Sequence, residues 1–187
     1  LHKIGEEAVG PLASFSLEGP GRKRLRTAPA RSERGGLSFD LIANPDNRLV
    51  EALRPVSDAW LAGRGTREKQ FSVGRFDPAY LLAFPIGIVR QQGRIIAFAN
   101  LLTTATGKAA ALDLMRYLPE APAGTMDFLL TALMLTLRDR GFAEFSLGMA
   151  PFSGIEPHQH SPWSARLGSL LFRHGGHFYN FEGLRAF

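Results

Sequence analysis

Residues 125–140 restrict the fold more than any other stretch, because they are apolar on nearly every helical face. Gly141 ends the segment, and Thr125 is a candidate N-cap with Asp127 in the first turn, where a negative charge suits the helix dipole. A helix with apolar side chains all round must be covered by other elements. The segment therefore predicts a buried helix packed against a sheet.

Apolar segments on both sides of this helix predict that sheet. Residues 85–90 and 94–103 flank a Gln-Gln-Gly turn, and residues 109–115 follow a second turn, which predicts a three-stranded meander. Residues 143–149 predict a strand after the helix, followed by a helix at 164–173 and a last strand at 177–181. The order predicts an α/β (α+β) fold, a mixed sheet flanked by helices.

The first 82 residues contribute further predicted elements. Alternating apolar side chains predict strands at 12–18, 37–42 and 71–76. Helical spacing predicts a helix at 47–62 that is capped by Asn44 or Asp46 and is kinked or divided at Pro55. Asp77-Pro78 predicts a short helix to residue 82.

The charge of the chain favours an anionic partner. The net charge is +5 in 187 residues, and a basic cluster lies before residue 35, with Arg22, Lys23, Arg24 and Arg26 at its centre. The cluster is either a solvated arm or a surface that binds a polyanion. We expect residues 1–45 to form an N-terminal strand, basic arm and connection, and residues 46–187 to form the main domain.

Several classes of site are excluded or disfavoured. The chain has no cysteine, so thiol nucleophiles, disulfides and cysteine-based metal sites are excluded. The sequence contains no apolar run long enough to predict a membrane span or a signal peptide. The pairs His158/His160 and His174/His177 are expected to be exposed loop residues rather than metal ligands. We therefore expect no metal and no cofactor.

The densest polar cluster is Asp113, Arg116, Thr125 and Asp127, around the end of one strand and the start of the apolar helix. A carboxylate in an apolar run is either paired or functional, since burying it alone is costly. Arg116 is the nearest candidate partner of Asp113. Positions three apart on a regular strand point to opposite faces, so the two converge only if the strand bends or ends near Met115. A structural salt bridge and a functional pair both remain open.

The order of segments resembles GCN5-type acyltransferases. In that family a glycine-rich loop between a strand and a helix holds the pyrophosphate of coenzyme A. Residues 117–125 occupy this place, but they contain one glycine and two prolines. Coenzyme A is therefore disfavoured as the donor.

An ordered set of motifs resembles the C-terminal synthase domain of MprF-type phosphatidylglycerol lysyltransferases. The motifs are Trp-Leu at 60–61, Glu-Lys-Gln-Phe-Ser-Val-Gly at 68–74, Ala-Phe-Ala-Asn at 97–100, Asp-Leu-Met-Arg at 113–116, Gly-Thr-Met-Asp at 124–127, Leu-Gly-Met-Ala-Pro at 147–151 and Phe-Tyr-Asn-Phe-Glu-Gly-Leu-Arg at 178–185. Each motif alone is weak, whereas the set in this order is specific.

The resemblance implies an aminoacyltransferase with a GCN5-acyltransferase-like fold, the second of two tandem folds. Such an enzyme moves an aminoacyl group, by default lysyl, from aminoacyl-tRNA to phosphatidylglycerol and so gives resistance to cationic antimicrobial peptides. The implied location is the cytoplasmic side of a bacterial cytoplasmic membrane, joined to an N-terminal acyltransferase-like half and a membrane flippase domain. Relative to the family pattern, the chain lacks the first fold and stops before a lysine-containing segment, and either can leave it inactive alone.

The resemblance also implies roles for individual residues. Asp113 and Arg116 match family active-site residues. Asp113 acts as a base or orients the donor's amino group, and Arg116 holds a phosphate or the tRNA 3′ end. The expected substrate-binding residues are Thr125, Asp127, Tyr179, Asn180 and Arg185. Two alternatives remain: a coenzyme A-dependent N-acyltransferase, and a non-catalytic module that binds tRNA or anionic lipid.

Overall fold

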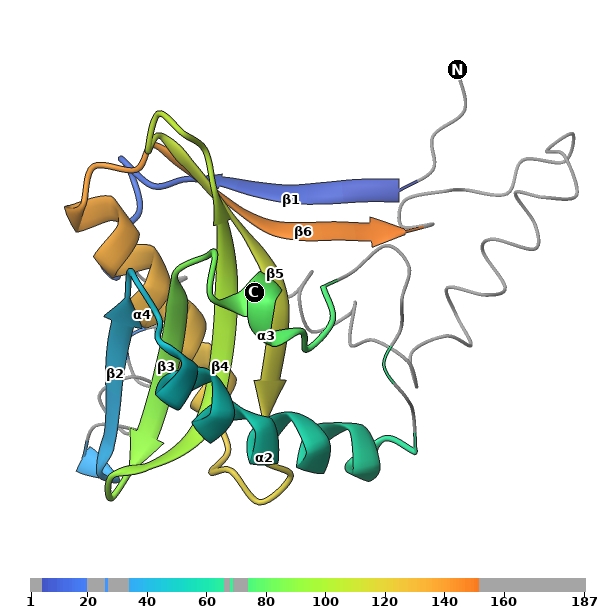
Figure 1. The fold of residues 1–187 in the computed structure, drawn as a ribbon. Coiled ribbons are helices and arrows are strands. Elements are labelled where there is room, and N and C mark those ends of the chain that lie inside the picture. Colours follow the sequence, from blue (N-terminus) through green and yellow to red (C-terminus); the bar gives the residue numbers. More distant parts are fainter. Residues whose placement is uncertain (1–4, 20–25, 27–33, 66–67, 69–73, 152–187) are drawn as a thin grey trace, which may run out of the picture. The chain divides into compact units, whose positions relative to one another are not determined.

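The computed structural model describes residues 5–19, 26, 34–65, 68 and 74–151. Figure 1 shows the fold of these residues. The strands are β1 (Gly5–Pro11), β2 (Leu37–Ile42), β3 (Ile86–Gln91), β4 (Arg94–Thr103), β5 (Ala109–Tyr117) and β6 (Glu144–Pro151), and the helices are α2 (Asn47–Gly63), α3 (Pro78–Leu81) and α4 (Thr125–Asp139). The predicted helix at 164–173 and strand at 177–181 lie outside the described residues.

Hydrogen bonding places β1 beside β6 and orders the other strands β5-β4-β3-β2. The chain divides into two compact units, one of residues 1–9 and 146–187 and a larger one of Gly10–Phe145. Within the larger unit β2, β3, β4 and β5 form an antiparallel meander, with Phe39 opposite Val89 and Ile88 opposite Phe98. In the smaller unit the Ser146 hydroxyl donates to the Glu7 carboxylate at 2.6 Å. The predicted division after residue 45 stays a prediction, and β2 lies within the larger unit.

Two helices cover opposite faces of the meander in the larger unit. Helix α2 packs on β4 and β5, whereas α4 packs on β2, β3 and β4 from the other side (Figure 1). Most apolar side chains of α4 are buried as expected, with Leu129 and Leu133 fully enclosed, whereas Met126 and Leu135 are partly exposed. Burying a leucine side chain contributes about 1.5–3 kcal/mol, so this helix is a main source of core stability. No helix in the described part of the chain is long and apolar enough to cross a membrane.

Most of the predicted elements are confirmed. The strand at 37–42, the meander, the strand after α4 and the two-sided burial of α4 all occur. Helix α2 begins at the predicted cap, where the Asp46 carboxylate accepts from the Leu49 N–H at 2.7 Å. Helix α3 begins with the Asp77 side chain accepting from the Tyr80 N–H and with Pro78 in its first turn.

Three expectations are wrong. The first strand is Gly5–Pro11 rather than 12–18, because Leu12 and Phe15 are buried in a turn, not on a strand face. Helix α2 is not divided at Pro55, since buried side chains on both sides of it hold one continuous helix, whereas a kink at Pro55 stays a prediction. The N-cap of α4 is Gly124, with φ 89°, and Thr125 is the first helical residue.

Candidate active site

A β-bulge brings Asp113 and Arg116 to the same face of the sheet. Ala99 pairs with Met115 and Leu101 pairs with Leu112, so Asp113 and Leu114 both lie opposite Asn100. The extra residue reverses the alternation of side chains, and positions three apart then share a face. This is the face covered by α2 and α3, because Asp113 contacts Tyr80 and Arg116 contacts Ser57.

Asn100 stabilises the bulge. A bulge leaves ladder N–H groups without a strand partner, and a buried N–H without a partner is costly. The fully buried Asn100 side chain accepts from the Leu114 N–H at 2.8 Å through Oδ1. Its Nδ2 donates to Asp113 Oδ2 at 3.3 Å. One amide therefore fixes both the strand distortion and the carboxylate beside it.

Three donors from separate segments hold the half-buried Asp113 carboxylate. The Gly74 N–H donates to Oδ1 at 2.9 Å, and the Tyr80 hydroxyl donates to Oδ2 at 2.9 Å. Asn100 is the third donor. Hydrogen bonds to an ionised group stabilise its charge and restrict its orientation. The site thus presents a negative charge at a defined position.

The phenol of Tyr80 remains neutral over the physiological range. Burial, together with the hydrogen bond to Asp113 and the charge of Asp113, raises the pKa of Tyr80 from 10.0 to about 12. A neutral phenol can donate a hydrogen bond, whereas a phenolate cannot. Tyr80 therefore keeps its proton for the hydrogen bond to Asp113 throughout the physiological range.

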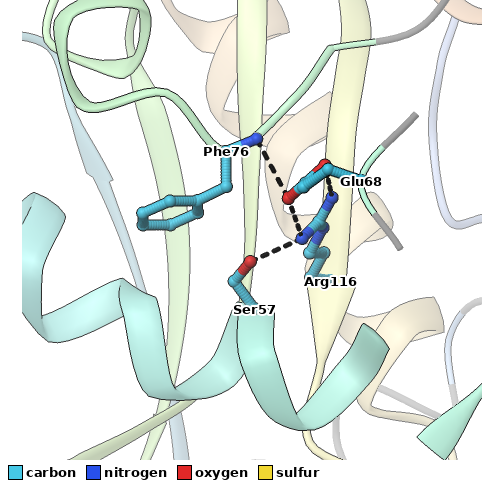
Figure 2. A network of polar contacts seen from close by, with 4 residues as sticks. All are labelled: Ser57, Glu68, Phe76 and Arg116. Carbon is cyan, nitrogen blue, oxygen red and sulfur yellow. Dashed lines mark hydrogen bonds and ion pairs between the residues drawn. The ribbon is translucent and has the colours of Figure 1, made fainter. Parts of the chain in front are cut away.

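Arg116 forms a buried ion pair with Glu68 (Figure 2). Its Nη1 and Nη2 donate to Oε1 and Oε2 of Glu68 at 2.7 and 2.8 Å, and Nη1 also donates to the Ser57 hydroxyl. The guanidinium is 3% exposed and lies over the Trp60 ring, 5.1 Å from its centroid. Glu68 also accepts from the Phe76 N–H at 3.3 Å. Both ends of the guanidinium fork are therefore occupied.

The expected pairing of Asp113 with Arg116 is wrong. Among the described residues, the hydrogen bonds of Arg116 go to Glu68 and Ser57, and those of Asp113 come from Gly74, Tyr80 and Asn100. The chain supplies Arg116 with a nearer carboxylate from the segment after α2. Glu68 lies on a different segment of the chain, so the spacing of residues along β5 does not predict that it pairs with Arg116.

The predicted four-residue polar cluster is split across the sheet. Thr125 and Asp127 lie in the first turn of α4, on the face opposite Asp113 and Arg116. The Thr125 hydroxyl donates to the Pro122 carbonyl at 2.7 Å, and its side chain is buried. The four residues do not form one cluster, because the loop at 118–124 takes the chain from one face of the sheet to the other.

Other predicted residues fall mainly outside the described part of the chain. Tyr179, Asn180, Arg185, both histidine pairs and Arg22, Lys23 and Arg24 are among them. Arg26 is described and exposed, and its Nη1 donates to the carbonyls of Leu17 and Gly19 at 2.8 and 3.0 Å. The described residues contain no group of three or more histidine, aspartate or glutamate side chains that could hold a metal ion.

Sequence reasoning missed Gly74, Tyr80, Asn100 and Glu68 as site residues. Asn100 carried a usable signal, since it is a polar side chain within the apolar strand 94–103. Glu68 and Gly74 are the first and last residues of the family-like motif at 68–74, but nothing in their residue types alone indicated a role in the site. Tyr80 was expected only as part of a short helix.

Comparison with known proteins adds the family. The family model described as "Phosphatidylglycerol lysyltransferase, C-terminal" matches residues 1–187. A phosphatidylglycerol lysyltransferase of Bacillus subtilis is 37% identical over 187 residues, which is 99% of this chain and 22% of the relative. The chain thus spans about a fifth of the length of that relative.

Solved structures agree with the sequence match. The C-terminal domain of an Agrobacterium fabrum protein assigned as a lysylphosphatidylglycerol synthetase is 45% identical, with a TM-score of 0.83 over 99% of this chain and 55% of that one. The Bacillus licheniformis protein called L-PGS is 37% identical, with a TM-score of 0.75 over 82% of this chain and 49% of that one. A fungal GCN5-related N-acetyltransferase region, 13% identical with a TM-score of 0.52 over 80% of this chain and 20% of that one, shares the fold alone. The α/β fold class predicted from the sequence is confirmed.

Proposed function

Because the chain belongs to the family of phosphatidylglycerol lysyltransferase C-terminal domains, we propose that it transfers a lysyl group to phosphatidylglycerol as part of a longer protein. The donor is lysyl-tRNA, and the acceptor is a glycerol hydroxyl of the lipid. The ester between the lysyl carbonyl and the tRNA ribose breaks, and a new ester to the glycerol oxygen forms. The acceptor's proton ends on the tRNA 3′ oxygen. An aminoacyl ester is already activated, so the transfer requires no ATP.

The observation that carries this proposal is the Asp113 carboxylate on a family-matched strand, held by three donors and half-buried. Acyl transfer to a hydroxyl needs a group that takes the acceptor's proton and a donor held in a productive orientation. A carboxylate fixed in this way is well suited to orienting the donor, because its negative charge is complementary to the positive charge of an ammonium group of the lysyl donor. We assign to Asp113 the orientation of the donor's amino group, with proton transfer as its other role.

We assign a supporting role to Arg116. Nη1 and Nη2 of Arg116 already donate to Glu68, and the side chain is 3% exposed, so a phosphate reaches these two atoms only if the Glu68 carboxylate moves away. Such an exchange removes Glu68 from a buried cation and costs free energy. Arg116 therefore holds Glu68, and through it the backbone N–H of Phe76, rather than the tRNA 3′ end. Tyr179, Asn180 and Arg185 remain proposed substrate contacts.

The wider setting of the domain follows from the family. We propose that it works on the cytoplasmic face of a bacterial membrane, next to a preceding acyltransferase-like half and a membrane flippase domain. Lysyl-phosphatidylglycerol carries more positive charge than its precursor, so its formation weakens the binding of cationic antimicrobial peptides. The basic residues Arg22, Lys23, Arg24 and Arg26 are the proposed contact with tRNA or anionic lipid.

The test is a lipid assay on the intact protein that contains this domain. Radiolabelled lysyl-tRNA, alanyl-tRNA and acetyl-coenzyme A are each supplied with phosphatidylglycerol vesicles, and the lipids are separated. We expect label from lysyl-tRNA in a lipid product, and none with phosphatidylethanolamine vesicles. Transfer from acetyl-coenzyme A alone would replace the proposal with a coenzyme A-dependent acyltransferase. Binding of tRNA without any transfer would indicate a non-catalytic module.

A further inference from the structure

The Asp113 carboxylate has one acceptor direction left open by its described neighbours. An ionised carboxylate offers about four lone-pair sites. Tyr80 and Asn100 occupy Oδ2, and Gly74 occupies one site on Oδ1. The remaining site on Oδ1 is where a substrate N–H or O–H group can bind. The three donors therefore decide where a substrate meets the carboxylate.

Gly74 approaches Asp113 so closely that no other residue fits. A Cβ atom at position 74 would lie 2.2 Å from Oδ2 and 2.7 Å from Cγ of Asp113. Neither distance is compatible with an unmoved carboxylate. The Gly74 N–H therefore donates to one oxygen of the carboxylate and the Tyr80 hydroxyl to the other, and a side chain at position 74 would displace the carboxylate.

Tyr80 is built to hold its hydroxyl in place. Its N–H is capped by Asp77 at 3.3 Å, and its ring packs against Phe84 with 5.0 Å between centroids. These contacts fix the backbone and the ring without using the hydroxyl. The hydrogen bond of that hydroxyl goes to Asp113. A phenylalanine at this position keeps the packing and removes one donor from the carboxylate.

We propose that Tyr80 is a positioning residue for the transfer, whose hydroxyl orients the Asp113 carboxylate so that its open Oδ1 site meets the donor or acceptor. The inference rests on the proposed function and adds to it a residue that acts through Asp113. Tyr80 itself takes no proton from the substrate. Its role is to keep the carboxylate turned toward the substrate.

The test compares Tyr80→Phe with the wild type in the intact protein, using the lysyl-tRNA and phosphatidylglycerol assay. We expect kcat to fall about tenfold or more, with KM for the lipid within about twofold. A merely structural tyrosine would lower the melting temperature without this split between kcat and KM. The matched control is Tyr117→Phe, which removes a phenol hydroxyl from the end of β5 and leaves Tyr80 unchanged.

A second variant guards against misfolding of the first. Gly74→Ala leaves Tyr80 intact and displaces the carboxylate directly, so it should also lower kcat. Gly10→Ala is its control, since a Cβ there meets its nearest atoms at 3.9 Å. An unchanged kcat in Tyr80→Phe, beside an inactive Asp113→Asn, would overturn the inference and leave the proposed function standing. A wild type that makes no lysyl-lipid would overturn both.

Discussion

Arg116 and Asp113 lie three residues apart on one strand and yet serve different partners. The bulge turns both side chains toward α2 and α3, where Glu68 takes the guanidinium and Tyr80 takes the carboxylate. A guanidinium binds a carboxylate through two parallel hydrogen bonds, which a lysine cannot reproduce. The Arg116–Glu68 contact therefore contributes to stability, and the Asp113 contacts define the candidate active site.

Removing Arg116 should destabilise the fold. Arg116→Ala leaves Glu68 without its cation, and we expect a loss of about 3 kcal/mol in the free energy of unfolding, at the low end for a broken buried pair because Glu68 is 30% exposed. Urea unfolding of both proteins measures the difference. The matched control is Arg94→Ala at the exposed Arg94–Glu120 pair, which should cost less than about 1 kcal/mol. Equal losses in the two variants would contradict a structural role for Arg116.

The raised pKa of Tyr80 predicts a stability change at high pH. In the unfolded chain a tyrosine ionises near its ordinary pKa of 10.0, whereas the folded value is about 12. The unfolded state therefore releases this proton first, and stability should fall as the pH rises from about 10 to about 12. Tyr80→Phe should flatten the fall in this window, as measured by chemical denaturation at each pH. A fall of the same steepness in Tyr80→Phe and in the parallel Tyr117→Phe variant would count against the assignment.

At the scale of elements, the bulge in β5 depends on Asn100. Asn100→Leu keeps the approximate volume but removes the acceptor of the Leu114 N–H and a donor to Asp113. An unsatisfied buried N–H costs about 1–3 kcal/mol, so the variant should unfold at lower urea concentration. In the Asn100→Leu variant, hydrogen exchange of the Leu114 N–H should become faster than in the wild type. The Leu112 N–H should change less, because Leu112 pairs regularly with Leu101. Unchanged protection at Leu114 would show that the bulge does not need the amide.

Elements with local signals were predictable from the sequence, and contacts between distant segments were not. Asp46 and Asp77 mark helix starts because capping depends on residues within one turn. The bulge opposite Asn100 depends on pairing between strands, and the pattern of apolar and polar residues in 109–117 does not predict it. The same limit explains why Asp113 was given the wrong partner. Glu68 lies 48 residues from Arg116, and only the packing of α2 on β5 brings them together.

The whole molecule carries an excess of positive charge that the candidate site does not use. The net charge is +5, and the basic cluster before residue 35 lies apart in sequence from Asp113. If Arg22, Lys23, Arg24 and Arg26 contact tRNA, affinity should fall steeply with salt. Neutralising all four in the intact protein should reduce the slope of log K against log salt by about three, since each phosphate contact contributes about 0.7–0.9. An unchanged slope would remove the cluster from tRNA binding.

The central claim is that Asp113 carries the transfer of the lysyl group, and Asp113→Asn in the intact protein tests it most directly. Asparagine keeps the volume and removes the charge and basicity, so packing and catalysis are separated. The account predicts that lysyl-phosphatidylglycerol formation falls to background while the melting temperature stays within about 4 °C of the wild type, the shift expected for about 1 kcal/mol in a domain of this size. Wild-type rates of lipid lysylation in Asp113→Asn would contradict the account, whatever the melting temperature.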